Sequence, residues 1–298
     1  MNTLPITKRV QIVSALVEGC SMRATSRMAG VSINTVTKLM VELGEVCADF
    51  HDRTVRNLRA ERVQADEAWA FCYAKEKNLP DSMRDKPGVG SVWTWTALDA
   101  DTKLMISWHV GTRDQQDAVE FMLDLASRLV TRVQLTTDGH NAYPRAVWEA
   151  FGTEVDYAQL IKTYGTPREG EARYSPAVCT GSFTIPRCGC PIPKDISTSL
   201  VERSNLTLRM GQRRYPRLTN GFSKKYENLC HSVALFFTFY NFCRVHKTLR
   251  VTPAMEAGLA DHVWTLEELV GLLESEERAV IGTAANKRGP YKRNRDIL

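Results

Sequence analysis

The sequence predicts an α/β fold, a mixed β-sheet flanked by helices, preceded by an N-terminal all-α domain that contains a helix-turn-helix. Two observations lead to this prediction. From residue 62 to about residue 151, strand-like and helical segments follow one another in the order strand, hairpin, helix, strand, helix. Before residue 62, apolar residues recur only at helical spacing. With 298 residues, the chain is long enough for about two domains.

The domain boundaries follow from these changes in pattern. We expect four parts, namely a helix-turn-helix domain over residues 1–45, a helical connector over 46–61, an α/β domain over 62–260, and a C-terminal helix with a basic tail over 261–298.

The composition is typical of a soluble globular protein, with 43% hydrophobic and 24% charged residues. The richest apolar run, residues 233–242, is too short to span a membrane. The N-terminus lacks the charged-then-apolar order of a secretion signal. We therefore expect a cytoplasmic protein with no membrane partner, in which the eight cysteines are reduced.

The N-terminal segment has the pattern of a helix-turn-helix. Residues 21–29 and 33–43 are helical, and Gly30 interrupts them at the turn. In the second helix, small polar and basic side chains face outward near its start, where such a helix enters the major groove of DNA. The residues expected to contact DNA there are Asn34, Thr35 and Lys38. An unrelated helical hairpin has the same pattern.

The α/β segment begins with an apolar strand over residues 62–71. Two aromatic and β-branched runs, 92–98 and 104–110, surround turn residues and predict a hairpin. Apolar residues at helical spacing predict a helix over 114–129. A short strand over 133–138 and a helix over 142–151 complete the block.

The rest of the chain begins with a segment rich in Gly, Pro and Ser, residues 164–194, for which we expect an extended loop. Helical periodicity then returns in four segments, residues 197–212, 223–242, 252–259 and 265–278.

Basic residues gather between Arg203 and Arg250, where ten bases stand against the single acid Glu227. Such a stripe suits a phosphate backbone, because each neutralised phosphate releases condensed counterions. A solvated basic face is the alternative. From this part of the chain we expect DNA contacts from Arg203, Asn205, Arg209, Arg213, Arg214, Lys224 and Lys225.

Three acids stand out by position. Asp66 lies inside an apolar run, where an ionised side chain is costly unless it is paired or binds a metal. Asp138 ends a predicted strand, and Glu202 lies on a predicted helix. Together they could hold two Mg²⁺ ions about 4 Å apart, with Mn²⁺ as a substitute. Such a metal pair activates a water or a 3′-hydroxyl and stabilises the leaving oxygen.

Each acid also has a structural explanation. Asp66 could pair with an arginine, Asp138 could belong to a plain turn with Gly139, and Glu202 could form a capping box with Ser199.

Glu67 and His140 lie close to two of these acids in the sequence. Glu67 adjoins Asp66 but should point to the opposite face of the strand, so we treat it as non-catalytic. His140 could contact the scissile phosphate or make a backbone hydrogen bond.

Four segments contain these acids or follow them, namely residues 64–69 (QADEAW), 136–143 (TTDGHNAY), 197–225 (STSLVERSNLTLRMGQRRYPRLTNGFSKK) and 240–254 (YNFCRVHKTLRVTPA). In this order they resemble segments of bacterial insertion-sequence transposases of the insertion-sequence-one type. The resemblance covers residues from about 60 to 260. It implies an RNase H-like fold, DNA strand transfer, and the catalytic acids Asp66, Asp138 and Glu202.

The sequence departs from that family at its N-terminus. Members often begin with a cysteine-rich zinc-binding element, whereas this segment has only Cys20 and Cys47. Elsewhere Cys179, Cys188 and Cys190 have no obvious fourth ligand nearby. Since a closed zinc site takes four ligands, free thiols are the alternative to a structural zinc there.

From these observations we expect a transposase that binds the inverted ends of its element, cleaves at the 3′ ends and joins them to target DNA. Two ends must be held together, so a homodimer or a larger synaptic assembly is expected. A nuclease of the same fold, such as a resolvase, is one alternative. The other is a catalytically inert, transposase-derived DNA-binding regulator.

Overall fold

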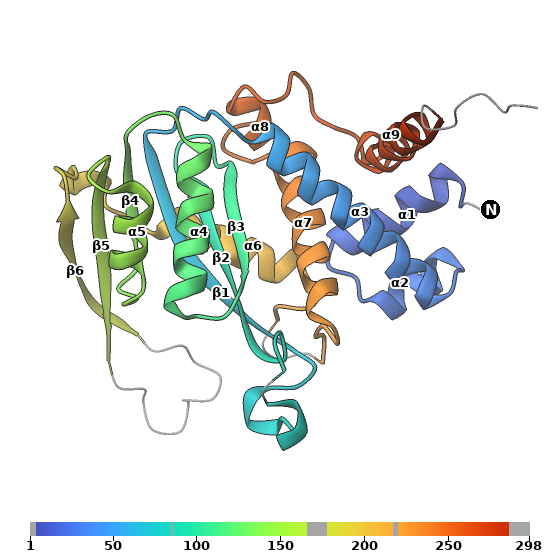
Figure 1. Ribbon diagram of the computed structural model, residues 1–298, viewed down its shortest axis with the longest axis horizontal. Coiled ribbons are helices and arrows are strands. Elements are labelled where there is room, and N and C mark those ends of the chain that lie inside the picture. Colours follow the sequence, from blue (N-terminus) through green and yellow to red (C-terminus); the bar gives the residue numbers. More distant parts are fainter. Residues whose placement is uncertain (1–3, 85, 166–177, 217–219, 286–298) are drawn as a thin grey trace, which may run out of the picture.

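The computed structural model describes residues 4–84, 86–165, 178–216 and 220–285 (Figure 1). The expected basic tail falls on residues 286–298, outside the described part of the chain.

A single six-stranded mixed sheet forms the centre of the α/β region, in the order β3-β2-β1-β4-β5-β6. Its central pairs, β1 with β4 and β4 with β5, are parallel. The outer pairs, β1 with β2, β2 with β3, and β5 with β6, are antiparallel. The strands are β1 (Arg62–Cys72), β2 (Gly90–Asp99), β3 (Met105–Gly111), β4 (Val133–Thr137), β5 (Val155–Tyr164) and β6 (Cys179–Cys188).

Helices cover both faces of this sheet (Figure 1). Successive side chains of a strand point to opposite faces, so each face of β1 has its own core. Val63 and Ala65 share one core with α4 (Gln115–Arg128) and α5 (Tyr143–Phe151). Ala68 and Ala70 share another with α6 (Ser199–Gly211) and α7 (Tyr226–Phe242). The predicted class, a mixed sheet flanked by helices, is confirmed.

The N-terminal helices are α1 (Ile6–Val17), α2 (Met22–Ala29) and α3 (Ile33–Thr54). Gly30 ends α2 with φ 65°, a left-handed conformation that favours glycine. The Ser32 side chain accepts a hydrogen bond from the Thr35 backbone and caps α3. However, α3 continues to Thr54 in one helix, so the expected boundary at residue 45 lies inside it.

The N-terminal helices do not pack by themselves. Ile12 and Val36 share a core with Ala234 of α7 and Leu269 of α9 (Leu266–Ala285). The continuous α3 follows from this packing, because Val46 and Cys47 extend its buried stripe beyond residue 45. Figure 1 shows α9 beside α1, so the C-terminal helix completes the N-terminal helical region.

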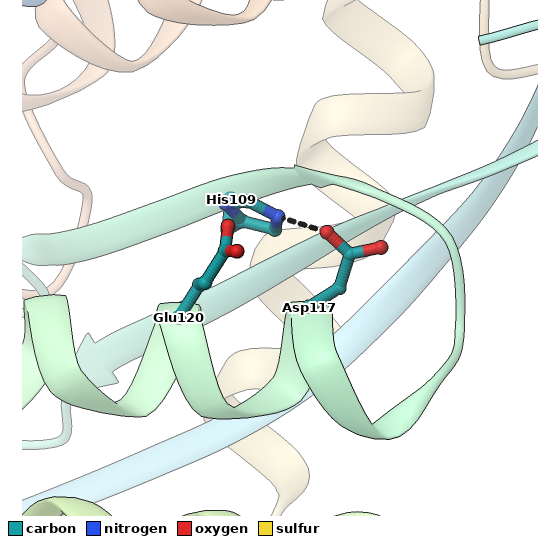
Figure 2. A group of neighbouring side chains, drawn as sticks. All are labelled: His109, Asp117 and Glu120. Atoms are coloured by element: carbon teal, nitrogen blue, oxygen red, sulfur yellow. Dashed lines mark hydrogen bonds and ion pairs between the residues drawn. The ribbon is translucent and has the colours of Figure 1, made fainter. Parts of the chain in front are cut away.

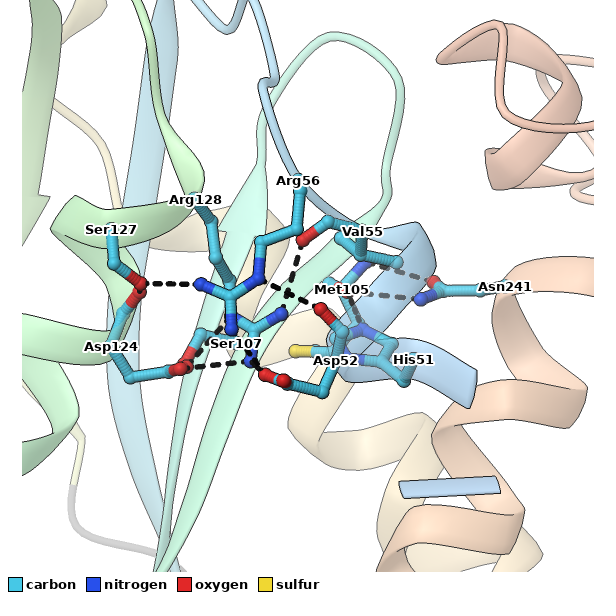
Figure 3. Close-up of polar contacts among 10 residues, drawn as sticks. All are labelled: His51, Asp52, Val55, Arg56, Met105, Ser107, Asp124, Ser127, Arg128 and Asn241. Carbon is cyan, nitrogen blue, oxygen red and sulfur yellow. Dashed lines mark hydrogen bonds and ion pairs between the residues drawn. The ribbon is translucent and has the colours of Figure 1, made fainter. Parts of the chain in front are cut away.

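A polar network attaches α3 to the sheet and to α4 (Figure 3). Arg128 of α4 donates hydrogen bonds to Asp52 of α3, to Asp124 and to the Val55 carbonyl. Beside it, the buried His51 ring lies 3.2 Å from the Met105 carbonyl of β3. These contacts fix the helical region against the α/β region.

Two strands were not predicted. No strand was predicted over β5, and β6 lies entirely within residues 164–194, for which a loop was expected. The residues of β6 are mostly exposed on both faces, so the strand lacks the apolar alternation that identifies a strand in sequence. Its pairing with β5 holds it in place. Cys179 and Cys188 lie at the two ends of β6, about 30 Å apart at the strand rise, so they cannot share a zinc ion.

The remaining short elements are three 3₁₀ helices and one helical turn, namely η1 (Glu76–Asn78), η2 (Asp81–Met83), η3 (Pro193–Asp195) and α8 (Pro253–Glu256). None of the helices in the described part of the chain combines the length and apolarity that spanning a bilayer demands.

Candidate functional site

The strand register places the first two predicted acids at the same level of the sheet. Ala65 of β1 pairs with Thr137, the last residue of the parallel strand β4. Asp66 follows Ala65 on β1, and Asp138 follows Thr137 directly after β4. The two acids therefore lie next to each other. Carboxylates at this edge of a parallel pair collect where ligands bind in α/β folds.

The third acid reaches the same place from α6. Asp66, Asp138 and Glu202 all line one pocket of about 600 Å³, together with Arg113, His140 and Lys162. A pocket of this volume accommodates a small ligand or part of a larger one. The sequence separated these acids by 72 and 64 residues, and the fold brings them together.

Burial and repulsion both act on Asp66. Desolvation, with the negative charges of Asp138 and Glu202, raises its pKa from 3.8 to about 6. The Asn205 amide of α6 donates a hydrogen bond of 2.9 Å to the Asp66 carboxylate and opposes that shift. Among the described residues, no arginine forms an ion pair with Asp66. The alternative that Asp66 is a structural acid paired with an arginine is therefore not supported.

Glu67 lies closer to the other acids than its strand position implies. Its side chain is on the α5 face, as expected, and accepts a hydrogen bond of 2.9 Å from the Tyr143 hydroxyl. Yet carboxylate oxygens of Asp66, Glu67 and Asp138 lie within 4.8 Å of one another. Because Asp138 follows the end of β4, its side chain can approach acids on both faces of β1.

Two opposing influences act on Glu67. Burial, together with the charges of Asp138 and Asp66, raises its pKa to about 7. Arg113 opposes it, since its Nε donates a hydrogen bond of 2.6 Å to the Glu67 carboxylate. The same guanidinium lies 3.9 Å from Asp138, so one cation serves two acids.

Glu202 is held by two partners that the sequence analysis did not identify. The Thr198 hydroxyl donates a hydrogen bond of 2.6 Å to its carboxylate, and Lys162 of β5 forms an ion pair with it. The capping box with Ser199 is not formed, because the N-cap residue of α6 is Thr198 and the Ser199 backbone N–H bonds to Ser197. The Glu202 carboxylate is therefore directed into the pocket.

Lys162 and Arg113 were missed for different reasons. The β-branched and aromatic residues of segment 155–164 are typical of a strand, and this pattern could have placed Lys162 on the sheet. No local pattern indicates that Lys162 meets Glu202, forty residues later, or that Arg113 meets Glu67.

The residues next to Asp138 form a compact turn. One Asp138 oxygen accepts a hydrogen bond of 2.9 Å from the His140 backbone, so the acid is also part of a turn. His140 Nδ1 accepts a hydrogen bond of 3.0 Å from the Ala142 backbone, as the structural alternative expected. That bond leaves Nε2 as the protonated nitrogen of the neutral ring, on a residue that lines the pocket.

The residues expected to contact DNA differ in how far their side chains are exposed to solvent. Thr35 and Arg209 are partly buried. The exposed ones are Asn34, Lys38, Arg203, Arg213, Lys224 and Lys225.

Two of the expected DNA contacts are turned into the protein. Asn205 is only 1% exposed, and its amide bonds to Asp66 and Thr96. Arg214 donates hydrogen bonds to Ser232 of α7 and to Met40 of α3, and burial lowers its pKa. Asn205 therefore orients an acid, and Arg214 joins helices.

A second group of residues that could bind a metal ion lies away from the pocket. It consists of His109 of β3 with Asp117 and Glu120 of α4 (Figure 2). Asp117 is already engaged, because it bonds to His109 Nε2 at 2.6 Å and accepts a hydrogen bond of 2.6 Å from the Thr112 backbone. These bonds hold the connection between β3 and α4, which explains the group without a metal.

No model of a protein family matches the sequence, and no curated protein is significantly similar to it. One similar solved structure is the crystal structure of the Mos1 strand transfer complex, with 16% sequence identity and a TM-score of 0.22. The match covers 52% of this chain and 59% of the Mos1 chain.

A second is the cryo-EM structure of the piggyBac transposase synaptic complex with hairpin DNA, with 11% identity and a TM-score of 0.35. The match covers 96% of this chain and 73% of that chain. At these identities and TM-scores the two matches carry no argument about function, which has to come from the geometry of the site.

Proposed function

We propose that this protein is a DNA transposase that binds the ends of its insertion element and carries out metal-dependent DNA strand cleavage and strand transfer. The observation that carries the proposal is the pocket where Asp66, Asp138 and Glu202 meet, contributed by a strand, a strand end and a helix. The acids repel one another there, so the pocket favours a bound cation.

The donor set fits magnesium, which prefers carboxylate oxygens and retains several waters. Asp66, Asp138 and Glu202 are the proposed ligands, with Mn²⁺ as a substitute for Mg²⁺. A bound metal pair would activate the attacking hydroxyl and stabilise the leaving oxygen.

The protein's own side chains prepare this site. Asn205 fixes one oxygen of Asp66, and Thr198 fixes one oxygen of Glu202. Lys162 and Arg113 offer positive charge at the rim, where a scissile phosphate would approach. His140 Nε2 is a further candidate donor to that phosphate.

The proposed DNA surface extends from the pocket along the exposed bases Arg203, Arg213, Lys224 and Lys225. Asn34 and Lys38, near the start of α3, are exposed and suit the recognition of element ends. The proposal includes the homodimer or larger assembly that two DNA ends require, and a cytoplasmic location.

The decisive experiment replaces Asp138 by Asn, which can keep the turn and removes the charge. We expect metal-dependent cleavage of element-end DNA to fall by at least about 100-fold, with unchanged DNA binding in a gel-shift assay. Asp81→Asn, an exposed acid outside the pocket, is the matched control and should cleave normally.

Strand-transfer products in a donor-plus-target assay distinguish a transposase from a nuclease such as a resolvase. A wild-type protein that binds end DNA tightly but cuts nothing with Mg²⁺ or Mn²⁺ would instead be the inert regulator. Full activity of Asp138→Asn would remove that acid from the site.

A further inference from the structure

Four aromatic side chains follow one another across the sheet and onto the segment before α7. Trp69 and Phe71 lie on β1, and their ring centroids are 5.8 Å apart. Trp93 of β2 is the cross-strand partner of Trp69 and shares its face of the sheet. Phe222 stacks on Phe71 at 5.1 Å, with an angle of 23° between the ring planes. We call these four residues the aromatic row.

The aromatic row is not part of a hydrophobic core. None of its four members packs in the three cores of the described residues, and each is partly exposed. Trp95 provides the contrast, because it lies two residues from Trp93 on the same face and is fully buried against Phe121 and Tyr143. Figure 1 shows β1 and β2 continuing past the N-terminal end of α4.

The rings are held in place rather than loosely exposed. Trp69 Nε1 donates a hydrogen bond of 3.3 Å to the Ser91 hydroxyl. The segment that carries Phe222 is attached to the end of β1, because the Tyr73 backbone donates a hydrogen bond of 2.8 Å to the Ser223 carbonyl. A set of ordered, partly exposed rings is preorganised for a ligand with flat faces.

Cations accompany the rings. The Arg113 guanidinium lies 4.5 Å from the Trp93 ring centroid, and the Lys75 ammonium lies 5.7 Å from that of Phe71. Lys224 and Lys225 are exposed just after Phe222. Arg113 also lines the acid pocket, so the row starts at the pocket and leads away from it along β1.

We propose that the aromatic row is a stacking platform for unpaired DNA bases next to the acid pocket. Bases stack on aromatic side chains with little regard to sequence, while neighbouring cations bind the phosphates. The bases of a duplex are already stacked on one another, so the row would select single-stranded or frayed DNA. This inference rests on the proposed function and adds to it the class of DNA beside the scissile phosphate.

The test measures binding of a short fluorescently labelled single strand, and of the same sequence as a duplex, by anisotropy without added metal. Phe71→Leu keeps an apolar side chain and removes the π face. We expect its Kd for the single strand to rise about 10-fold, while its Kd for the duplex stays within about 2-fold. Trp69→Leu should behave in the same way, and the matched control Phe183→Leu, an exposed ring on β6, should leave both Kd values unchanged.

Circular dichroism and thermal unfolding of each variant confirm that it is folded. Unchanged single-strand affinity in both row variants, or an equal loss in Phe183→Leu, would overturn the inference. Metal-dependent cleavage by the wild-type protein is scored separately. Cleavage without a single-strand preference removes only the platform, whereas a row-dependent single-strand preference without cleavage removes the proposed function and keeps the platform.

Discussion

Two regions of the molecule gather carboxylates where a helix meets the sheet, and they treat them in opposite ways. In the junction network of Asp52, Arg56, Asp124 and Arg128, each acid bonds to a guanidinium (Figure 3). At the acid pocket, which Asp66, Asp138 and Glu202 line, the buried Glu67 lies close to Asp66 and Asp138, and Arg113 is shared between Glu67 and Asp138.

The pKa values record the difference. Burial alone raises the pKa of Asp124, but hydrogen bonds from Arg128 and Ser107 outweigh it and hold the pKa below its usual value. Burial and the neighbouring acids together raise the pKa of Asp66 to about 6. A satisfied network of this kind holds elements together, whereas mutual repulsion in a pocket marks a site that favours an incoming cation.

The largest expected effect comes from breaking the junction network. Arg128→Met leaves Asp52 and Asp124 without their shared guanidinium, which is itself nearly buried. We expect the free energy of unfolding to fall by about 3 kcal/mol, measured by urea denaturation. Arg145→Met removes the exposed pair with Glu149 and should cost less than about 0.5 kcal/mol, and equal losses in the two variants would contradict the comparison.

Acid should weaken the same junction through His51. Burial and the nearby Arg128 lower its pKa from 6.5 to about 3, so the unfolded chain binds the proton more tightly than the folded protein. The stabilising contribution of neutral His51 is complete above about pH 6.5 and is lost as the pH falls toward 3. Taken as the difference between the wild type and His51→Gln, the loss in the free energy of unfolding between pH 7 and pH 5 should be about 2 kcal/mol.

His51→Gln should remove most of that pH dependence. His262→Gln should leave it in place, because the pKa of the exposed His262 is raised by Asp261 and Glu268 and its effect has the opposite sign. If the wild type and His51→Gln lose stability in parallel on acidification, His51 does not titrate as its burial implies.

The smallest expected effect compares the two regions most directly. The same substitution, Asp to Asn, should change the free energy of unfolding in opposite directions in the two regions. In metal-free protein at about pH 8, Asp66→Asn removes a repelled charge and should raise the free energy of unfolding by about 1 kcal/mol. Asp124→Asn removes a paired charge and should lower it by about 1 kcal/mol. Urea denaturation of both variants measures the difference, and the same sign in both would show that the two acid groups are not distinct.

Much of the fold could be predicted from local patterns. The hairpin of β2 and β3, the amphipathic α4 and the strand that leads to Asp138 were all found within a few residues of their observed ends. Their signals lie in segments of 16 residues or fewer, where periodicity identifies the element. The edge strand β6 gave no such signal, since an exposed strand has no buried face to impose alternation.

For the candidate site, the sequence identified the acids but not their partners. Asn205 and Arg214 were expected to face DNA, because residue type alone does not distinguish a DNA contact from a buried polar side chain in a basic segment. Their side chains instead bond to Asp66 and to Ser232, contacts that span 139 and 18 residues.

The sequence by itself determined most of the helices and the strands with a buried face, and which acids lie where an uncompensated charge is costly, because both depend on neighbours along the chain. Only the tertiary structure decided that Glu67 joins the acids, that Lys162 pairs with Glu202, and that the aromatic row lies outside the cores. These are distances between segments far apart in sequence, set by sheet register and helix packing, and no local pattern of residues encodes them.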